Sequence, residues 1–111
     1  MVNLNSQSCE ACKIGAPKVT EDEINDLLLE IKEWTLIKSP IKKIQKVFSF
    51  KSYEDSLNFS IKIAKLADEE DHHPQIILEW GKVTVTWWSH KIEGLHYNDF
   101  ICAAKSDRLY K

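Results

Sequence analysis

The strongest constraint on the fold of this chain is a predicted β-hairpin in its second half. Two apolar runs, Ile76–Trp80 and Val83–Trp88, lie on either side of Gly81-Lys82. Glycine can adopt the positive φ that a tight two-residue connection needs. A loop of these two residues makes one face of the hairpin apolar and fixes the strand pairing as Trp80 with Val83, Leu78 with Val85 and Ile76 with Trp87. The pattern predicts an antiparallel pair of strands with one buried face.

The remaining patterns extend this hairpin into an α+β domain. Thr20 and Glu23 form a capping box at the start of a helix predicted over 21–33. The spacing of apolar residues then predicts strands over 34–38 and 41–50, a long helix over 53–71 and a last helix over 97–108. The order α-β-β-α-β-β-α lacks the regular alternation that a parallel sheet requires. We therefore predict an α+β fold with an antiparallel sheet.

The long helix predicted over 53–71 carries an unusually wide apolar arc. Ser52 is a suitable N-cap, and no glycine or proline interrupts the chain from there to Pro74. Two apolar stripes follow helical spacing, Leu57, Ile61 and Ala64 on one side and Phe59, Ile63 and Leu66 on the other. One stripe is sufficient for packing on a sheet, so we expect the other to meet a partner, as in a homo-oligomer.

Length and charge exclude several classes of protein. A chain of 111 residues fits one domain, which we assign to 20–111, with 1–19 as a partly ordered leader. A net charge of −2 gives no overall attraction to nucleic acid or to anionic lipid. No apolar run is long enough to span a membrane, no secretory signal is visible, and the three cysteines cannot all pair internally. We expect a cytoplasmic protein with free thiols.

The candidate chemistry is concentrated in the segment that ends the long helix. This segment contains His72-His73-Pro74, and Pro74 disfavours helical geometry at the residue before it. Extending the predicted hairpin register places His73 beside His90. Asp68, one helical turn before His72, is expected to orient an imidazole ring. Three histidines and a carboxylate are thus predicted to lie close together.

Three interpretations of this cluster remain open. The histidines can be solvated residues at a helix C-terminus, where positive charge is favourable. They can be ligands of a zinc ion, although few further residues are present to hold the rings in place. They can also act as general acid and base in an elimination of water, because imidazole exchanges protons near neutral pH. The third interpretation requires neither metal nor cofactor.

The other motifs carry less information. Cys9 and Cys12 supply two of the four ligands of a structural zinc site, and nothing completes the set. The glycines are scattered, so no nucleotide-binding loop is expected. Trp80 and Trp87 are predicted to pack in the core or at an interface, whereas Trp88 falls on the face of His73 and His90 and can stack on a planar ligand.

The spacing of these residues resembles the pterin-4a-carbinolamine dehydratase family. The positions that carry the resemblance span about 20–108 and read Trp34, Asp68, His72-His73-Pro74, Trp80, His90, Gly94-Leu95 and Asp99. The resemblance implies a four-stranded antiparallel sheet with three helices on one face. Where many relatives have Leu-Thr before the last helix, this chain has Leu95-His96, so His96 or Asn98 must cap that helix.

The resemblance also implies an activity and a site. Family members dehydrate 4a-hydroxytetrahydropterin to quinonoid dihydropterin without a cofactor, in the recycling of tetrahydrobiopterin after aromatic amino-acid hydroxylation. His72 and His90 match acid-base positions, and His73 matches a residue that positions the ring. The pterin site is expected to include Trp34, Asp68, Pro74, Trp88 and Asp99, with Asp99 orienting a histidine or capping the last helix.

The family's partners and other roles give further expectations. Members are dimers or tetramers, and functional coupling to an aromatic amino-acid hydroxylase is possible. Some relatives are dimerisation cofactors of a transcription factor, and others are suspected of an accessory role in the synthesis of pterin-containing cofactors. A non-catalytic interaction module is therefore the alternative function. Such a module has no need of all three histidines, and this chain retains them.

Overall fold

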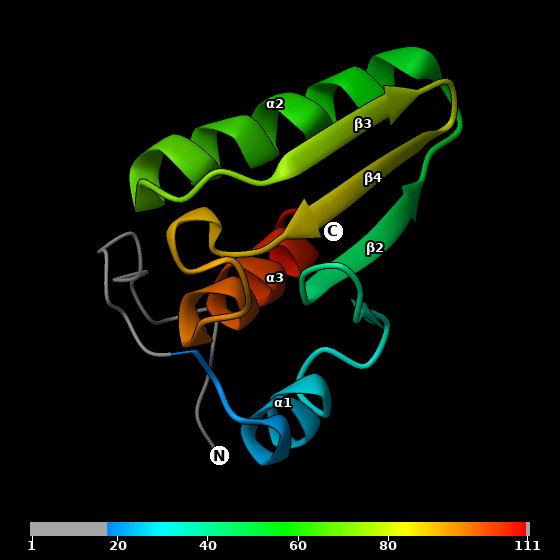
Figure 1. Cartoon of the computed structure of the whole chain (residues 1–111). Helices are drawn as coiled ribbons and strands as arrows, with labels where there is room; N and C mark the ends of the chain where they lie inside the picture. The colour runs from blue at the N-terminus through cyan, green and yellow to red at the C-terminus, as the bar shows by residue number, and fades with distance from the viewer. Residues whose placement is uncertain (1–17, 111) are drawn as a thin grey trace.

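The computed structural model describes residues 18–110, which form three α-helices and a four-stranded antiparallel sheet (Figure 1). Along the chain the elements are α1 (Glu21–Leu28), β1 (Thr35–Ile37), β2 (Lys43–Ser49), α2 (Tyr53–Glu70), β3 (Gln75–Glu79), β4 (Lys82–Trp87), the 3-10 helix η2 (His90–Ile92) and α3 (Tyr97–Leu109). The strand order is β1-β2-β4-β3, so the two longest strands are central. The predicted α+β class and order of elements are confirmed.

Side-chain caps determine where the helices begin. Thr20 accepts a hydrogen bond from the backbone N–H of Glu23, and Ser52 accepts one from Asp55, as predicted. His96 caps α3 and accepts from the backbone N–H of Asn98 at 3.1 Å. The predicted end of the first helix was wrong, because α1 ends at Leu28 and turns occupy the residues up to Trp34.

The core lies between one face of the sheet and the helices. The sheet contributes five buried residues to it: Ile44, Phe48, Val83, Val85 and Trp87. The ring of Phe48 lies 4.6 Å from that of Phe59 on α2, and the indole N–H of Trp87 donates to Ser106 on α3. Both helices therefore cover the same face, and α1 adds Ile24 to the same core.

The β3–β4 hairpin differs from the prediction in its register. The observed pairs include Leu78 with Val83 and Ile76 with Val85, so the loop is Trp80-Gly81 and not Gly81-Lys82. Gly81 adopts φ +77°, a conformation that side chains disfavour, and it occupies the second loop position. Trp80 consequently lies in the turn, 72% exposed, so of the two predicted environments packing in the core is wrong, and packing at an interface stays a prediction.

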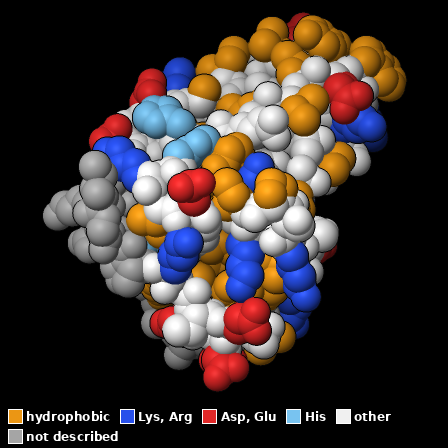
Figure 2. All heavy atoms as spheres, in the orientation of Figure 1, with side chains coloured by type: hydrophobic (Ala, Val, Ile, Leu, Met, Phe, Trp, Pro, Cys, Tyr) orange, Lys and Arg blue, Asp and Glu red, His pale blue; other side chains and the backbone are white. Residues whose placement is uncertain are grey.

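Helix α2 presents an apolar stripe to solvent in addition to the one it buries. Phe59, Ile63 and Leu66 are buried, whereas Leu57 and Ile61 are 40% and 44% exposed. Figure 2 shows apolar side chains gathered along α2 and at the tip of the hairpin. The two predicted stripes are therefore confirmed. None of the described helices is long and apolar enough to cross a membrane.

Candidate active site

Three segments that are distant in sequence meet at one end of the sheet. They are the turn that leads from α2 into β3, the segment between β4 and η2, and the first turn of α3. Asp71 ends α2 in the left-handed conformation, φ 50°, and the backbone N–H of His72 then donates to Ala67. This turn directs His72 inward and His73 outward. Figure 2 shows histidine side chains next to one another on the surface in this region.

His72 is buried and paired with a buried carboxylate. Its Nε2 lies 2.5 Å from Oδ1 of Asp99, and both residues are 2% exposed or less. The other carboxylate oxygen of Asp99 accepts from the Ser89 hydroxyl at 2.8 Å and from the backbone N–H of His96 at 2.9 Å. The ring of His72 also stacks on Trp87, with 9° between the planes. Asp99 thus both contacts a histidine and helps to cap α3, the two alternatives implied by the family resemblance.

His73 and His90 are the exposed imidazoles of the cluster. Nε2 of His90 donates to the backbone carbonyl oxygen of His73 at 3.1 Å. A carbonyl oxygen can only accept, so Nε2 carries a proton, and Nδ1 of the neutral ring is left as a basic nitrogen. Nε2 of His73 lies 3.3 Å from Oδ1 of Asp68, and both side chains are mostly exposed.

The hairpin brings His73 and His90 together, although not as the predicted register implied. The β3–β4 ladder ends at the pair Gln75 and Thr86, and His90 begins η2. The contact runs from the ring of His90 to the backbone of His73 and not between two rings on one strand face. Asp68 contacts an imidazole of the cluster, as expected, but the ring is that of His73 and not that of His72, because α2 ends before His72.

Trp88 forms an aromatic surface beside the exposed histidines. It is half-buried, and its ring centroid lies 4.3 Å from that of His90. The ammonium of Lys43 lies 4.1 Å from the Trp88 ring centroid. Because Ile44 pairs with Trp87, the next residues outward, Lys43 and Trp88, are neighbours on the opposite face of the sheet. Sequence reasoning missed Lys43, which only the pairing of β2 with β4 reveals.

Of the predicted site residues, Trp34 contacts the far end of α3, and Pro74 shapes the backbone that follows His73. Trp34 is 5% exposed and its indole N–H donates to the carboxylate of Asp107, eight residues after Asp99 on α3. Eight residues of helix span about 12 Å, so the described chain does not bring Trp34 to the histidines. Pro74 is half-buried and follows His73 directly, where it begins the path into β3.

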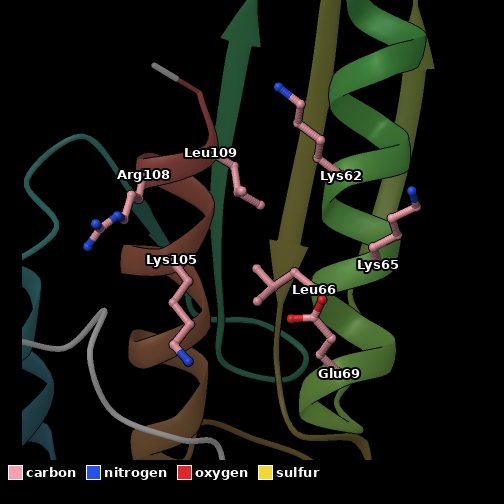
Figure 3. A pocket seen from close by; sticks show the side chains of 7 residues that line it. All are labelled: Lys62, Lys65, Leu66, Glu69, Lys105, Arg108 and Leu109. Carbon is pink, nitrogen blue, oxygen red and sulfur yellow. The ribbon is translucent and has the colours of Figure 1, made fainter.

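A groove elsewhere on the described chain is a second candidate site and lies away from the histidines. It has a volume of about 540 Å³ and runs between α2 and α3, with Leu66 and Leu109 at its centre (Figure 3). Lys65 and Arg108 point away from the groove in Figure 3, so only part of its basic lining faces a common space. The histidine cluster is therefore the stronger candidate site.

The arrangement at the histidines suits proton transfer better than metal binding. Among residues 18–110, no group of three or more His, Cys, Asp or Glu side chains could hold a metal ion. The Cys9-Cys12 pair lies outside the described residues. The site offers the exposed imidazole of His90 against the Trp88 ring and bound to the backbone of His73, whose own imidazole is exposed, with the buried imidazole of His72 held by Asp99.

Comparison with known proteins identifies the family. A family model described as "Pterin 4 alpha carbinolamine dehydratase" matches residues 17–109, nearly the whole chain. The chain belongs to the pterin-4a-carbinolamine dehydratase family. The resemblance inferred from the histidine spacing is thereby confirmed, and with it the class of enzyme, a hydro-lyase.

Relatives in the family match over their full lengths. A protein of Photobacterium profundum named "Putative pterin-4-alpha-carbinolamine dehydratase" is 55% identical over 109 residues, 97% of each chain. One of the same name from Marinobacter nauticus is 53% identical, over 99% of this chain and all of its own.

Solved structures share the fold. A protein of Brucella melitensis described as a transcriptional coactivator/pterin dehydratase matches with a TM-score of 0.80 and 26% identity, over 86% of this chain and all of that one. A pterin dehydratase-like protein described as a RuBisCO assembly factor in the alpha-carboxysome matches with a TM-score of 0.60 and 26% identity, over 70% of this chain and 89% of that one.

Proposed function

We propose that this protein dehydrates 4a-hydroxytetrahydropterins to quinonoid dihydropterins by histidine acid-base catalysis. The reaction breaks the bond between C4a and the hydroxyl oxygen, which leaves as water once protonated. The N5 lone pair forms the new C4a–N5 double bond, and N5 gives its proton to a base. No electron is gained or lost overall, so the reaction needs one acid, one base and a surface that holds the ring. The observation that carries the proposal is that the exposed ring of His90 lies against Trp88 and is bound to the backbone of His73, a second exposed histidine.

The exposures of the three histidines suggest how they divide the work. His90 is exposed and has a basic Nδ1, so we assign it the N5 proton. His73 is exposed and its Nε2 lies 3.3 Å from Oδ1 of Asp68, which holds the ring, so we assign His73 the role of the acid that donates a proton to the leaving hydroxyl. His72 is almost completely buried and its Nε2 is bound to Asp99, so we assign it a positioning role. This division exchanges the roles of His72 and His73 implied by the family resemblance.

The remaining predicted site residues surround this centre. Trp88 provides the ring-stacking surface, Asp68 holds His73, and Pro74 fixes the backbone whose carbonyl binds His90. Asp99 acts through His72. We propose no direct substrate contact for Trp34 within one chain, because its indole N–H is directed to Asp107.

We further infer the setting in which this reaction occurs. The product and substrate are those of tetrahydrobiopterin recycling, which couples the protein functionally to an aromatic amino-acid hydroxylase in the cytoplasm. We also infer a homodimer or homotetramer, because the exposed stripe of α2 includes Tyr53, Leu57 and Ile61. Light scattering at micromolar concentration should give at least twice the 12.9 kDa chain mass, and a monomer would contradict this inference.

Stopped-flow measurement on freshly generated 4a-carbinolamine tests the activity. The uncatalysed reaction competes, so the rate must be compared with that of buffer alone. His90→Ala should lower kcat by about 10²- to 10⁴-fold, the usual contribution of a positioned acid or base. Lys51→Ala is a matched surface control, on an exposed residue between β2 and α2, and should keep the wild-type rate. Wild-type protein that does not exceed the buffer rate would refute the proposal.

A non-catalytic interaction function is the second candidate. The observation that favours it is that both structural neighbours carry descriptions of interaction roles, a coactivator and an assembly factor. The same stopped-flow assay separates the two candidates, because an interaction module requires neither exposed histidine. An oligomer that forms normally but accelerates no dehydration would favour the interaction function.

A further inference from the structure

Among the residues that the structure describes, Lys43 has no carboxylate partner, and it lies at the edge of the candidate active site. Its side chain is half-buried on β2, and its ammonium lies over the ring of Trp88 at 4.1 Å from the centroid. Trp88 in turn lies against His90, with 4.3 Å between ring centroids. The ammonium of Lys43 and the imidazole of His90 therefore both lie against the same indole ring.

The neighbouring lysines differ from Lys43 in having ion-pair partners. Lys42 lies 3.3 Å from Glu21, and Lys46 lies 3.0 Å from Glu33 and 2.7 Å from Asp107. Within residues 18–110, no carboxylate lies within ion-pair distance of Lys43. The electron-rich face of an indole attracts a cation but leaves its charge uncompensated.

We propose that Lys43 binds an anionic group, a phosphate or a carboxylate, on the side chain of the pterin substrate. This inference rests on the proposed function and extends its range of substrates: the neutral carbinolamine of tetrahydrobiopterin recycling is a substrate, and pterins with a negatively charged substituent react more efficiently. The lysine stem is flexible, so the ammonium can leave the Trp88 ring and follow an anion on the ligand. That movement exposes the indole face for the pterin ring. One side chain thus couples recognition of the charge to the opening of the stacking surface.

The size of the expected preference follows from the exposure of the site. A charge-assisted hydrogen bond from a half-buried lysine is expected to raise kcat/KM about tenfold, and screening by salt should reduce this effect. Two 4a-carbinolamines with the same ring are compared, one with a neutral dihydroxypropyl side chain and the other with its phosphorylated counterpart. A carboxylated side chain provides a third arm, which distinguishes charge from phosphate shape.

The test is the ratio of kcat/KM for the anionic substrate to that for the neutral one. Wild-type protein should give a ratio of about ten, and Lys43→Met, which keeps the apolar stem, should lower it to about one. Lys42→Met is the matched control, one residue away and paired with Glu21, and should keep the ratio of about ten. A wild-type ratio near one, or a ratio that Lys43→Met does not change, would overturn the proposal.

Equilibrium binding separates this proposal from the proposed function. Quenching of tryptophan fluorescence by stable dihydropterins, neutral and phosphorylated, measures the same preference without catalysis. If no dehydration is detected but the phosphorylated ligand still binds about tenfold more tightly in a Lys43-dependent manner, the proposed function fails and the role of Lys43 stands. Equal binding of both ligands by wild-type protein would refute the role of Lys43 independently of activity.

Discussion

Replacing Asp99 should destabilise the protein far more than replacing an ordinary surface carboxylate. Its side chain is completely buried and accepts hydrogen bonds from His72, Ser89 and the backbone of His96. Asp99→Ala removes the acceptor of three hydrogen bonds, two from buried side chains and one from a part-buried backbone N–H. Each hydrogen bond to a charged acceptor contributes roughly 1.5–3 kcal/mol, but losses within one network are not additive, so we expect about 4 kcal/mol in total.

A loss of this size is easily measured. Domains of this length are stable by roughly 5–15 kcal/mol, and each kcal/mol corresponds to about 4 °C in Tm. Asp99→Ala should therefore lower Tm by about 15 °C. Urea titration followed by tryptophan fluorescence gives the free energy of unfolding directly, and Trp87, stacked on His72, lies next to the altered site.

Asp99→Asn provides the matched comparison. The amide oxygen can still accept from Ser89 and from the backbone of His96, while the amide nitrogen donates to Nε2 of His72 if the proton of that ring moves to Nδ1. We expect a loss of only about 1–2 kcal/mol from this variant. An Asp99→Ala protein within about 1 kcal/mol of wild type, or an asparagine variant as unstable as the alanine one, would refute the hydrogen-bond account.

Three other outcomes can be checked independently. Burial disfavours the charge of Lys46, but hydrogen bonds to Asp107 and Glu33 outweigh this and raise its pKa. This contribution to stability is complete below the unfolded-state pKa of about 10.4 and is lost as pH rises through the higher folded-state value. Urea titrations should therefore show that the difference in free energy of unfolding between wild type and Lys46→Met shrinks only above about pH 10.5. Gly81→Ala should lower the free energy of unfolding by about 1–2 kcal/mol in the same titration. The loop holds φ +77° at this residue, and a Cβ would lie 3.3 Å from the carbonyl oxygen of Phe50. An unchanged stability would mean that the turn rearranges. Dehydratase activity should survive dialysis against a chelator, and about one zinc per chain, lost together with activity, would contradict an acid-base mechanism without metal.

Local signals are sufficient to predict α2 almost to the residue. Ser52 supplies the cap, no glycine or proline interrupts the next turns, and Pro74 excludes helical geometry just beyond the end. The helix ends at Glu70, one residue earlier than predicted, because Asp71 adopts the left-handed conformation. The apolar stripes of α2 are equally predictable, since they depend only on helical spacing.

The hairpin register could not be settled by the same kind of signal. A two-residue loop containing Gly81 can place the glycine first or second, and the two registers differ by two residues. A shift of two leaves every side chain on the same face of the strand, so the apolar alternation fits both. The predicted buried face is therefore confirmed, while the partners of individual residues, and the position of Trp80, are not.

The partners of the site residues depend on tertiary contacts that no spacing rule contains. The helical rule points from Asp68 to His72, yet the helix ends between them, and Asp99, on another helix 27 residues later, is the partner. Lys43 contacts Trp88 only because β2 pairs with β4, although α2 and β3 lie between these strands in the sequence. The sequence thus predicts which residues gather at the site, but not which carboxylate binds which imidazole.

Single-turnover stopped flow on the His73→Ala/His90→Ala double variant tests the central claim most directly. If the two exposed imidazoles act on one transition state, each single variant loses most of the acceleration. The double variant then loses much less than the product of the two single losses. Retained secondary structure and oligomeric state would show that the loss is chemical. Full wild-type rates in both single variants would contradict the account and leave the interaction function as the better description.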